Sequence, residues 1–166
     1  MEKGYTITAG QLPGLLGDVA ALHGRYYARD WGFPTYFEAK VAREMGDFLQ
    51  RYDTSRDRVL SVSGNGRVLG SITLDSSDPD AQDGQAHLRW FILDEALAGQ
   101  GLGKQLLGDV IAFARLAGLT SIYLTTFRDL EPAGTLYARA GFRIVAEEAG
   151  ATWGQEVVEQ RLQLDL

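Results

Sequence analysis

The 166-residue sequence contains no cysteine, so it offers no disulfide, no thiolate zinc site and no cysteine nucleophile. Its two histidines, His23 and His87, are too few to hold a metal without several carboxylate ligands, and we expect no metal. No apolar run reaches the roughly 18 residues of a membrane-spanning helix. The first five residues lack the apolar stretch of a signal peptide. Together these absences favour a cytoplasmic location and no membrane partner.

Basic residues are also scarce, with 16 Lys and Arg against 22 Asp and Glu, for a net charge of −6. A domain that binds nucleic acid usually carries a basic patch, so we expect no nucleic-acid partner. Hydrophobic residues make up 45% and charged residues 23% of the chain, which is typical of a globular protein. The length predicts a single domain over residues 1–166.

Hydrophobic periodicity predicts the order of the secondary-structure elements. Alternating or β-rich segments predict strands at residues 5–8, 59–63, 68–74, 86–93, 121–126, 142–146 and 157–164. Apolar spacings of three and four predict helices over residues 15–27, 37–49, 102–114 and 133–140. Asn65-Gly66 predicts a tight hairpin, and residues 75–85 an exposed loop. The pattern indicates an α/β fold, a mixed sheet of about seven strands with four helices on both faces.

A glycine-rich segment follows the fourth predicted strand and opens the third predicted helix. It comprises Ala98, Gly99, Gln100, Gly101, Leu102, Gly103 and Lys104. Glycines allow a tight turn, and the free N–H groups of a helix start favour an anion such as a phosphate. The segment matches neither the dinucleotide fingerprint nor the Walker loop, because Leu106 and Gln105 stand where those motifs need Gly and Ser or Thr. Plain turn-and-cap geometry is the alternative.

Two segments resemble signatures of the GNAT N-acetyltransferase superfamily. Residues 98–103 (AGQGLG), after the strand end 91–94 (FILD), resemble its acetyl-CoA loop, and residues 135–142 (TLYARAGF) resemble its second signature. A closer likeness is to the acetyltransferase half of MarR-type regulator fusions, carried by residues 88–93, 126–131 and 153–156. The chain departs from the family pattern at Ala98, where Arg or Gln is usual, and at Leu130, where many members carry Asn.

The resemblance implies a mostly antiparallel sheet whose fourth and fifth strands are parallel and splay apart around acetyl-CoA, the acyl donor. The backbone of Phe91, Ile92 and Leu93 then binds the pantetheine arm, and the glycine-rich segment holds the pyrophosphate. Tyr137 is implied as the general acid that protonates the departing thiolate. Packing of its ring on an apolar helix face is the alternative.

Four further residues are candidates for binding the acceptor. Strict alternation places His87, Arg89, Phe91 and Leu93 on one face of their strand. Arg89 on that face binds either an anionic group of the acceptor or a neighbouring acid. His87 is either the unidentified general base or an exposed residue at the strand end. His23 and Tyr27 share a helix face that the resemblance places in the acceptor wall, and Trp153 belongs either to the same wall or to the core.

The function predicted from these residues is transfer of an acetyl group from acetyl-CoA to a primary amine of a small molecule, by direct attack in a ternary complex. The acceptor carries a carboxylate in one version of this prediction. The alternatives are a protein or peptide N-acetyltransferase and an acyl-CoA-binding regulatory or sensor module. We expect a monomer or a homodimer.

Overall fold

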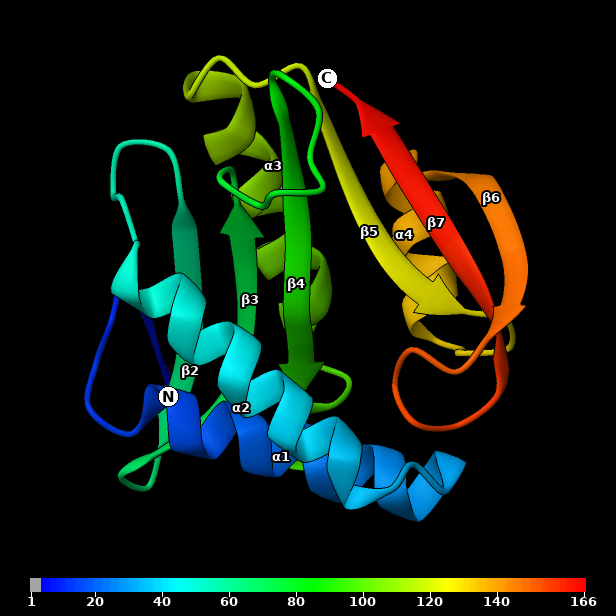
Figure 1. Cartoon of the computed structure of the whole chain (residues 1–166). Helices are drawn as coiled ribbons and strands as arrows, with labels where there is room; N and C mark the ends of the chain where they lie inside the picture. The colour runs from blue at the N-terminus through cyan, green and yellow to red at the C-terminus, as the bar shows by residue number, and fades with distance from the viewer. Residues whose placement is uncertain (1–3) are drawn as a thin grey trace.

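The computed structural model describes residues 4–166, so part of the N-terminal segment used for the signal-peptide expectation lies outside it. Seven strands form one sheet in the order β1-β2-β3-β4-β5-β7-β6 (Figure 1). They are β1 (Thr6–Ala9), β2 (Arg58–Gly64), β3 (Arg67–Asp75), β4 (Gln85–Leu93), β5 (Ser121–Phe127), β6 (Arg143–Gly150) and β7 (Val157–Asp165). In the described chain only β4 and β5 pair in parallel. The predicted mixed, mostly antiparallel sheet is confirmed.

Helices cover both faces of the sheet, as predicted. They are α1 (Leu15–Trp31) and α2 (Thr35–Gln50) on one face, and α3 (Leu102–Leu116) and α4 (Ala133–Ala140) on the other (Figure 1). A single-turn 3₁₀ helix, η1 (Glu95–Leu97), follows β4. Each helix layer buries its apolar stripe against one face of the sheet, which gives two hydrophobic clusters. No helix of residues 4–166 combines the length and the hydropathy that a membrane span requires.

The turn between β2 and β3 confirms the predicted hairpin. Asn65 and Gly66 have φ angles of 53° and 75°, and a tight hairpin turn of this kind needs positive φ at both central residues. The loop over residues 75–85 is different from the expected exposed segment. Asp75 is fully buried and Asp78 is 9% exposed, because both carboxylates form ion pairs with arginines. The expectation of exposure holds at residues 79, 80 and 82–84 and was wrong at residues 75, 78 and 85, since composition alone cannot show such partners.

A β-bulge interrupts β4 and changes which side chains share a face. Thr73 pairs with Arg89 and Ser71 pairs with Ile92, so Trp90 and Phe91 together oppose one residue of β3. Trp90 adopts the left-handed region, with φ of 48°. It packs with the α1/α2 layer, whereas Phe91 and Leu93 pack with the α3 layer. The prediction that Phe91 and Leu93 share a face with His87 and Arg89 was therefore wrong.

Candidate active site

The strands β4 and β5 separate in the middle of the sheet. They pair from Gln85↔Ser121 to His87↔Tyr123 and then diverge toward their carboxyl ends (Figure 1). Beyond the pairing with β5, β4 keeps only its β3 partner in the described chain. The backbone of Phe91, Ile92 and Leu93 therefore faces the gap along one edge. A cavity of about 320 Å³ opens between the two strands, bounded also by α1, α2, α4 and the loop between β6 and β7.

Aromatic side chains form one wall of this cavity. The rings of Tyr27 and Phe33 lie 5.3 Å apart, and Phe33 stacks on Trp153 at 6.4 Å. Phe127 of β5 contacts Phe33 at 5.4 Å and Trp153 at 5.8 Å, which joins the α1–α2 connection, β5 and the β6–β7 loop. Such ring pairs stabilise the folded state by more than their buried area alone would give. The aromatic side chains of this wall are therefore held in position before a ligand binds. Tyr27 and Trp153, both predicted from the sequence, line the cavity.

His23 also lines the cavity, one helical turn before Tyr27, and its ring stacks on that of Tyr27 at 6.1 Å. Its Nδ1 lies 2.8 Å from the carbonyl oxygen of Val19, which can only accept, so Nδ1–H is the donor. Burial lowers the pKa of His23 to about 4, against a smaller opposing effect of that hydrogen bond. His23 is therefore a neutral wall residue at physiological pH.

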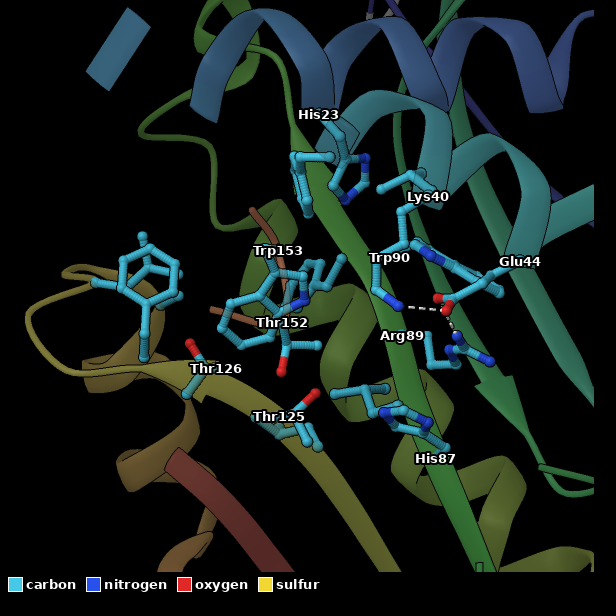
Figure 2. A pocket seen from close by; sticks show the side chains of 18 of the residues that line it. His23, Lys40, Glu44, His87, Arg89, Trp90, Thr125, Thr126, Thr152 and Trp153 are labelled. Atoms are coloured by element: carbon cyan, nitrogen blue, oxygen red, sulfur yellow. Dashed lines mark hydrogen bonds and ion pairs between the residues drawn. The ribbon is translucent and has the colours of Figure 1, made fainter. Parts of the chain in front are cut away.

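Charged side chains form the opposite wall (Figure 2). The guanidinium of Arg89 lies 2.8 Å from Glu44 of α2, 3.2 Å from Asp78 and 3.4 Å from Asp75. Lys40 pairs with Glu44 at 2.6 Å. Of the two readings of Arg89, the ion pair with neighbouring acids is the one present in this structure. Arg51, directly after α2, also forms an ion pair with Asp75, at 2.7 Å. This wall is therefore cross-linked to the helix layer.

His87 lies inside the site and is not an exposed strand-end residue. Its side chain is 13% exposed, its Nδ1 lies 2.8 Å from Oδ2 of Asp78, and its ring stacks on Tyr123 at 4.3 Å. Burial lowers the pKa of His87 below its ordinary value, and the Asp78 carboxylate only partly opposes this. Burial acts to raise the pKa of Asp78, but hydrogen bonds from His87 and the Asp80 N–H, with the charge of Arg89, hold it well below its usual range.

Tyr137 lies on α4, one of the elements around the cavity. It is 7% exposed, and its ring contacts Phe91 at 6.2 Å and Phe142 at 5.7 Å. Burial raises the pKa of the phenol, so Tyr137 stays protonated over the physiological range. Gly141, with φ of 104°, ends α4 and turns the chain into β6. Tyr137 thus packs against apolar neighbours and also lines the cavity.

The predicted glycine-rich segment leads from the end of β4 into α3. Gly99 and Gly101 have φ angles of 76° and 73°, which side chains rarely adopt. The N–H groups from Gly99 to Lys104 donate no hydrogen bond within residues 4–166, and the stretch is largely exposed. Gly103 lets α3 approach α4, since a Cβ there would lie 3.3 Å from Leu136. These free donors at a helix start suit the linked phosphates of a coenzyme.

Sequence reasoning missed five charged residues of the cavity: Lys40, Glu44, Asp78, Asp80 and Arg161. Lys40 and Glu44 are four apart on a helix, which signals a shared face, but nothing local indicates that this face meets Arg89. Asp78 lies in a loop, and Arg161 is 34 residues or more from the other cavity strands, β4 and β5. Only the packing of the chain brings them together.

Comparison with known proteins agrees with this arrangement. The model of the acetyltransferase (GNAT) family matches residues 22–142. The chain is 30% identical over 114 residues to N-acetyltransferase 8 of Rattus norvegicus, covering 68% of this chain and 51% of that protein. It is 38% identical over 71 residues to the spermine/spermidine N(1)-acetyltransferase of Bacillus subtilis, covering 42% and 47%. The chain spans about half the length of the curated relatives it matches.

Solved structures share the fold over nearly the whole chain. The structure of yncA from Salmonella typhimurium with its cofactor acetyl-CoA aligns with a TM-score of 0.72 at 20% identity, covering 99% of this chain and 95% of that one. The ribosomal-protein-S18-alanine N-acetyltransferase of Escherichia coli aligns with a TM-score of 0.68 at 18% identity, covering 97% and 93%. At this level of identity the likeness concerns the fold alone.

Proposed function

The chain belongs to the acetyltransferase (GNAT) family, and we propose that it moves an acetyl group from acetyl-CoA to a primary amine of a small molecule, as one catalytic domain. One observation carries this proposal: the gap between β4 and β5 joins a loop of free N–H donors to a cavity lined by aromatic and charged side chains. A coenzyme and an amine can therefore meet at one place. Phe33, between α1 and α2, stacks on Trp153 of the β6–β7 loop beside the cavity, and this aromatic wall favours a small acceptor over a peptide.

The residues present fit the coenzyme. The N–H groups of residues 99–104 bind the pyrophosphate, and the free edge of β4 at Phe91, Ile92 and Leu93 binds the pantetheine through its backbone. Ala98 is exposed and lacks the side chain that would add a further contact, so the backbone supplies most of the affinity. Lys104 is exposed at the helix start and adds a positive charge nearby. Leu130, at the usual position of an Asn, offers only apolar contact to the pantetheine.

When bound, acetyl-CoA supplies an acetyl group activated as a thioester. Two proton movements accompany attack by the amine: the ammonium loses a proton, and the departing thiolate gains one. Tyr137 gives a proton to the sulfur as the C–S bond breaks and the C–N bond forms, and the proton released from the amine nitrogen restores the phenol through solvent. The raised pKa of Tyr137 keeps the phenol protonated, so that the proton is available for transfer.

His87 is the proton acceptor in our proposal. The Asp78 carboxylate accepts from Nδ1–H, which leaves Nε2 with a free lone pair. The lowered pKa of His87 keeps the imidazole neutral at physiological pH, so it can take a proton from an ammonium in the cavity. Arg89 holds the Asp78 carboxylate and Glu44 in place in the same wall. His23, Tyr27 and Trp153 contact the apolar part of the acceptor.

Release of free thiol from acetyl-CoA with a panel of amines tests this proposal. The absence of cysteine is useful here, because a thiol reagent detects coenzyme alone, without a background from the protein. We expect steady turnover with at least one small amine and none without an amine. Binding of acetyl-CoA with no turnover on small amines or peptides would instead favour the regulatory or sensor module, in keeping with the resemblance to the MarR fusions. Turnover with peptides alone would favour the protein acetyltransferase.

A further inference from the structure

Arg161 differs from the other basic residues of the cavity. Lys40 and Arg89 are both ion-paired with Glu44, and Arg89 also with Asp78. Arg161, on β7, lines the same cavity, yet no carboxylate of residues 4–166 lies within ion-pair distance of it. Among the residues that the structure describes, the cavity therefore contains one permanent positive charge with no carboxylate in contact with it.

The side chain of Arg161 is nevertheless held in place. Its guanidinium lies 3.8 Å from the centroid of the Tyr123 ring, and its Nη2 donates to Oε1 of Gln85 at 3.2 Å. Gln85 is only 4% exposed, and its amide nitrogen donates to Ser121 at 3.2 Å and Gln163 at 3.5 Å. These bonds aim the amide oxygen at Arg161. Stacking and a neutral acceptor orient a guanidinium while leaving most of its five donors unused.

The side chain of Arg161 lies on the face of the sheet that lines the cavity. Arg161 pairs with Thr125 of β5 across the sheet, so the two side chains share the face that also carries Tyr123. Thr125 faces the charged wall of β4 across the cavity (Figure 2). A planar anion seated between Thr125 and Arg161 receives a hydroxyl donor and a forked pair of N–H donors.

We propose that Arg161 binds a carboxylate of the acceptor, so that the acceptor is an amine that carries a carboxylate, such as an amino acid. This inference rests on the proposed function and names the class of its substrate. Arg89 is less suited to the role, because its donors already contact Glu44, Asp75 and Asp78, and an incoming carboxylate would meet three negative charges there. The aromatic wall at the other side of the cavity suits an apolar side chain on the same acceptor.

Paired acceptors and paired variants test this inference. The acceptors are amino acids with apolar side chains and their carboxamides, which lack the negative charge and have a less basic amine. The variants are Arg161→Gln and Arg161→Lys, with Arg143→Gln as the matched control. Arg143 lies on the neighbouring strand β6, and its side chain is 58% exposed and paired with Asp165. Circular dichroism and acetyl-CoA binding report whether each variant remains folded.

We expect Arg161→Gln to lower kcat/KM for the amino acids by about 10- to 100-fold, mainly through KM, and to leave the carboxamides within about twofold. Arg161→Lys retains the charge and loses less, and Arg143→Gln changes neither series. Using the variant-to-wild-type ratio for each acceptor cancels the intrinsic difference in amine reactivity. Equal losses for both series, or no loss for the amino acids, would overturn the inference.

A binding measurement separates this inference from the proposed function. Calorimetry with the same amino acids and carboxamides, in the presence of coenzyme A, needs no turnover. If the amino acids bind the wild type more tightly than the carboxamides and Arg161→Gln removes that difference, the carboxylate site stands even if no acetyl transfer is seen. If turnover occurs but the wild type binds both series equally, the proposed function stands and the carboxylate site does not.

Discussion

Nδ1 of His87 and Oδ2 of Asp78 lie 2.8 Å apart, which joins a residue of β4 to the loop before it. The carboxylate accepts, so Nδ1 carries the hydrogen and Nε2 remains the basic nitrogen. Asp75 and Arg89 also act electrostatically on His87, and Tyr123 covers one side of its ring. This pair makes His87 a base whose orientation is fixed by its neighbour.

Removal of His87 should change both the rate and its dependence on pH. His87→Gln is expected to lower kcat/KM at pH 7 by the roughly 10²- to 10⁴-fold typical of one acid–base group. The pKa of His87 is lowered, so the imidazole is protonated only at a pH below the ordinary histidine value of 6.5. The wild-type rate should therefore fall only below that pH. That acidic limb should be absent in the variant. Asp78→Asn should lower kcat/KM less than His87→Gln does, and it should move the acidic limb of the pH–rate profile to a different pH.

A pH–rate profile of the three proteins, measured with one amine at saturating acetyl-CoA, provides the check. If His87→Gln keeps the wild-type rate and profile, another group or solvent accepts the proton.

Tyr137→Phe should remove the proton donor and leave the fold intact. The ring still fills the space beside Phe91 and Phe142, so coenzyme binding and thermal stability should change little. Turnover should fall by about 10²- to 10⁴-fold, because the thiolate then leaves without protonation. Stopped assays and calorimetry with acetyl-CoA measure the two effects separately. Wild-type turnover in this variant would leave Tyr137 with a packing role only.

Gly101→Ala should weaken acetyl-CoA binding. Its φ of 73° costs an alanine roughly 1 kcal/mol or more, which the loop relieves by turning its N–H groups away from their present directions. Gly118→Ala is the matched control, because Gly118 has a φ of 79° at the other end of α3, and neither position crowds a new Cβ. Both variants should lose similar stability, but only Gly101→Ala should raise the Kd for acetyl-CoA. Equal Kd values for the two variants would contradict the phosphate role of the loop.

The stability of the protein should fall as the solution is acidified from pH 6.5 to pH 4. Burial lowers the pKa of His23 to about 4, from an ordinary value of 6.5, so in this interval the unfolded chain binds a proton that the folded chain does not. The free energy of unfolding therefore rises with pH across the interval, and about 3 kcal/mol is lost below it. His87 adds a loss of the same sign. Urea unfolding at several pH values, compared between wild type and His23→Phe, should show a shallower slope for the variant; parallel slopes would exclude His23 as the cause.

Local patterns in the sequence determined the order of the elements, the hairpin at Asn65-Gly66 and the glycine-rich helix start at Gly101. Each depends on side-chain periodicity or on a backbone preference of a few consecutive residues. The placement of Tyr27, Tyr137 and Trp153 at one cavity followed from the resemblance to a known fold, and the structure brings all three to that cavity.

Tertiary packing alone decided the chemistry of the charged wall. The bulge at Trp90 reverses the alternation of β4, because a strand pattern does not show where a partner strand opposes one residue with two. The ion pair of Arg89 with Glu44 joins residues 45 positions apart, and the isolation of Arg161 depends on strands that meet only in the folded sheet. Ion pairs form between residues that are close in space, whereas periodicity is a property of neighbours along the chain. A sequence pattern therefore predicts the helices and strands around the site, and only the folded chain determines which charged side chains pair there.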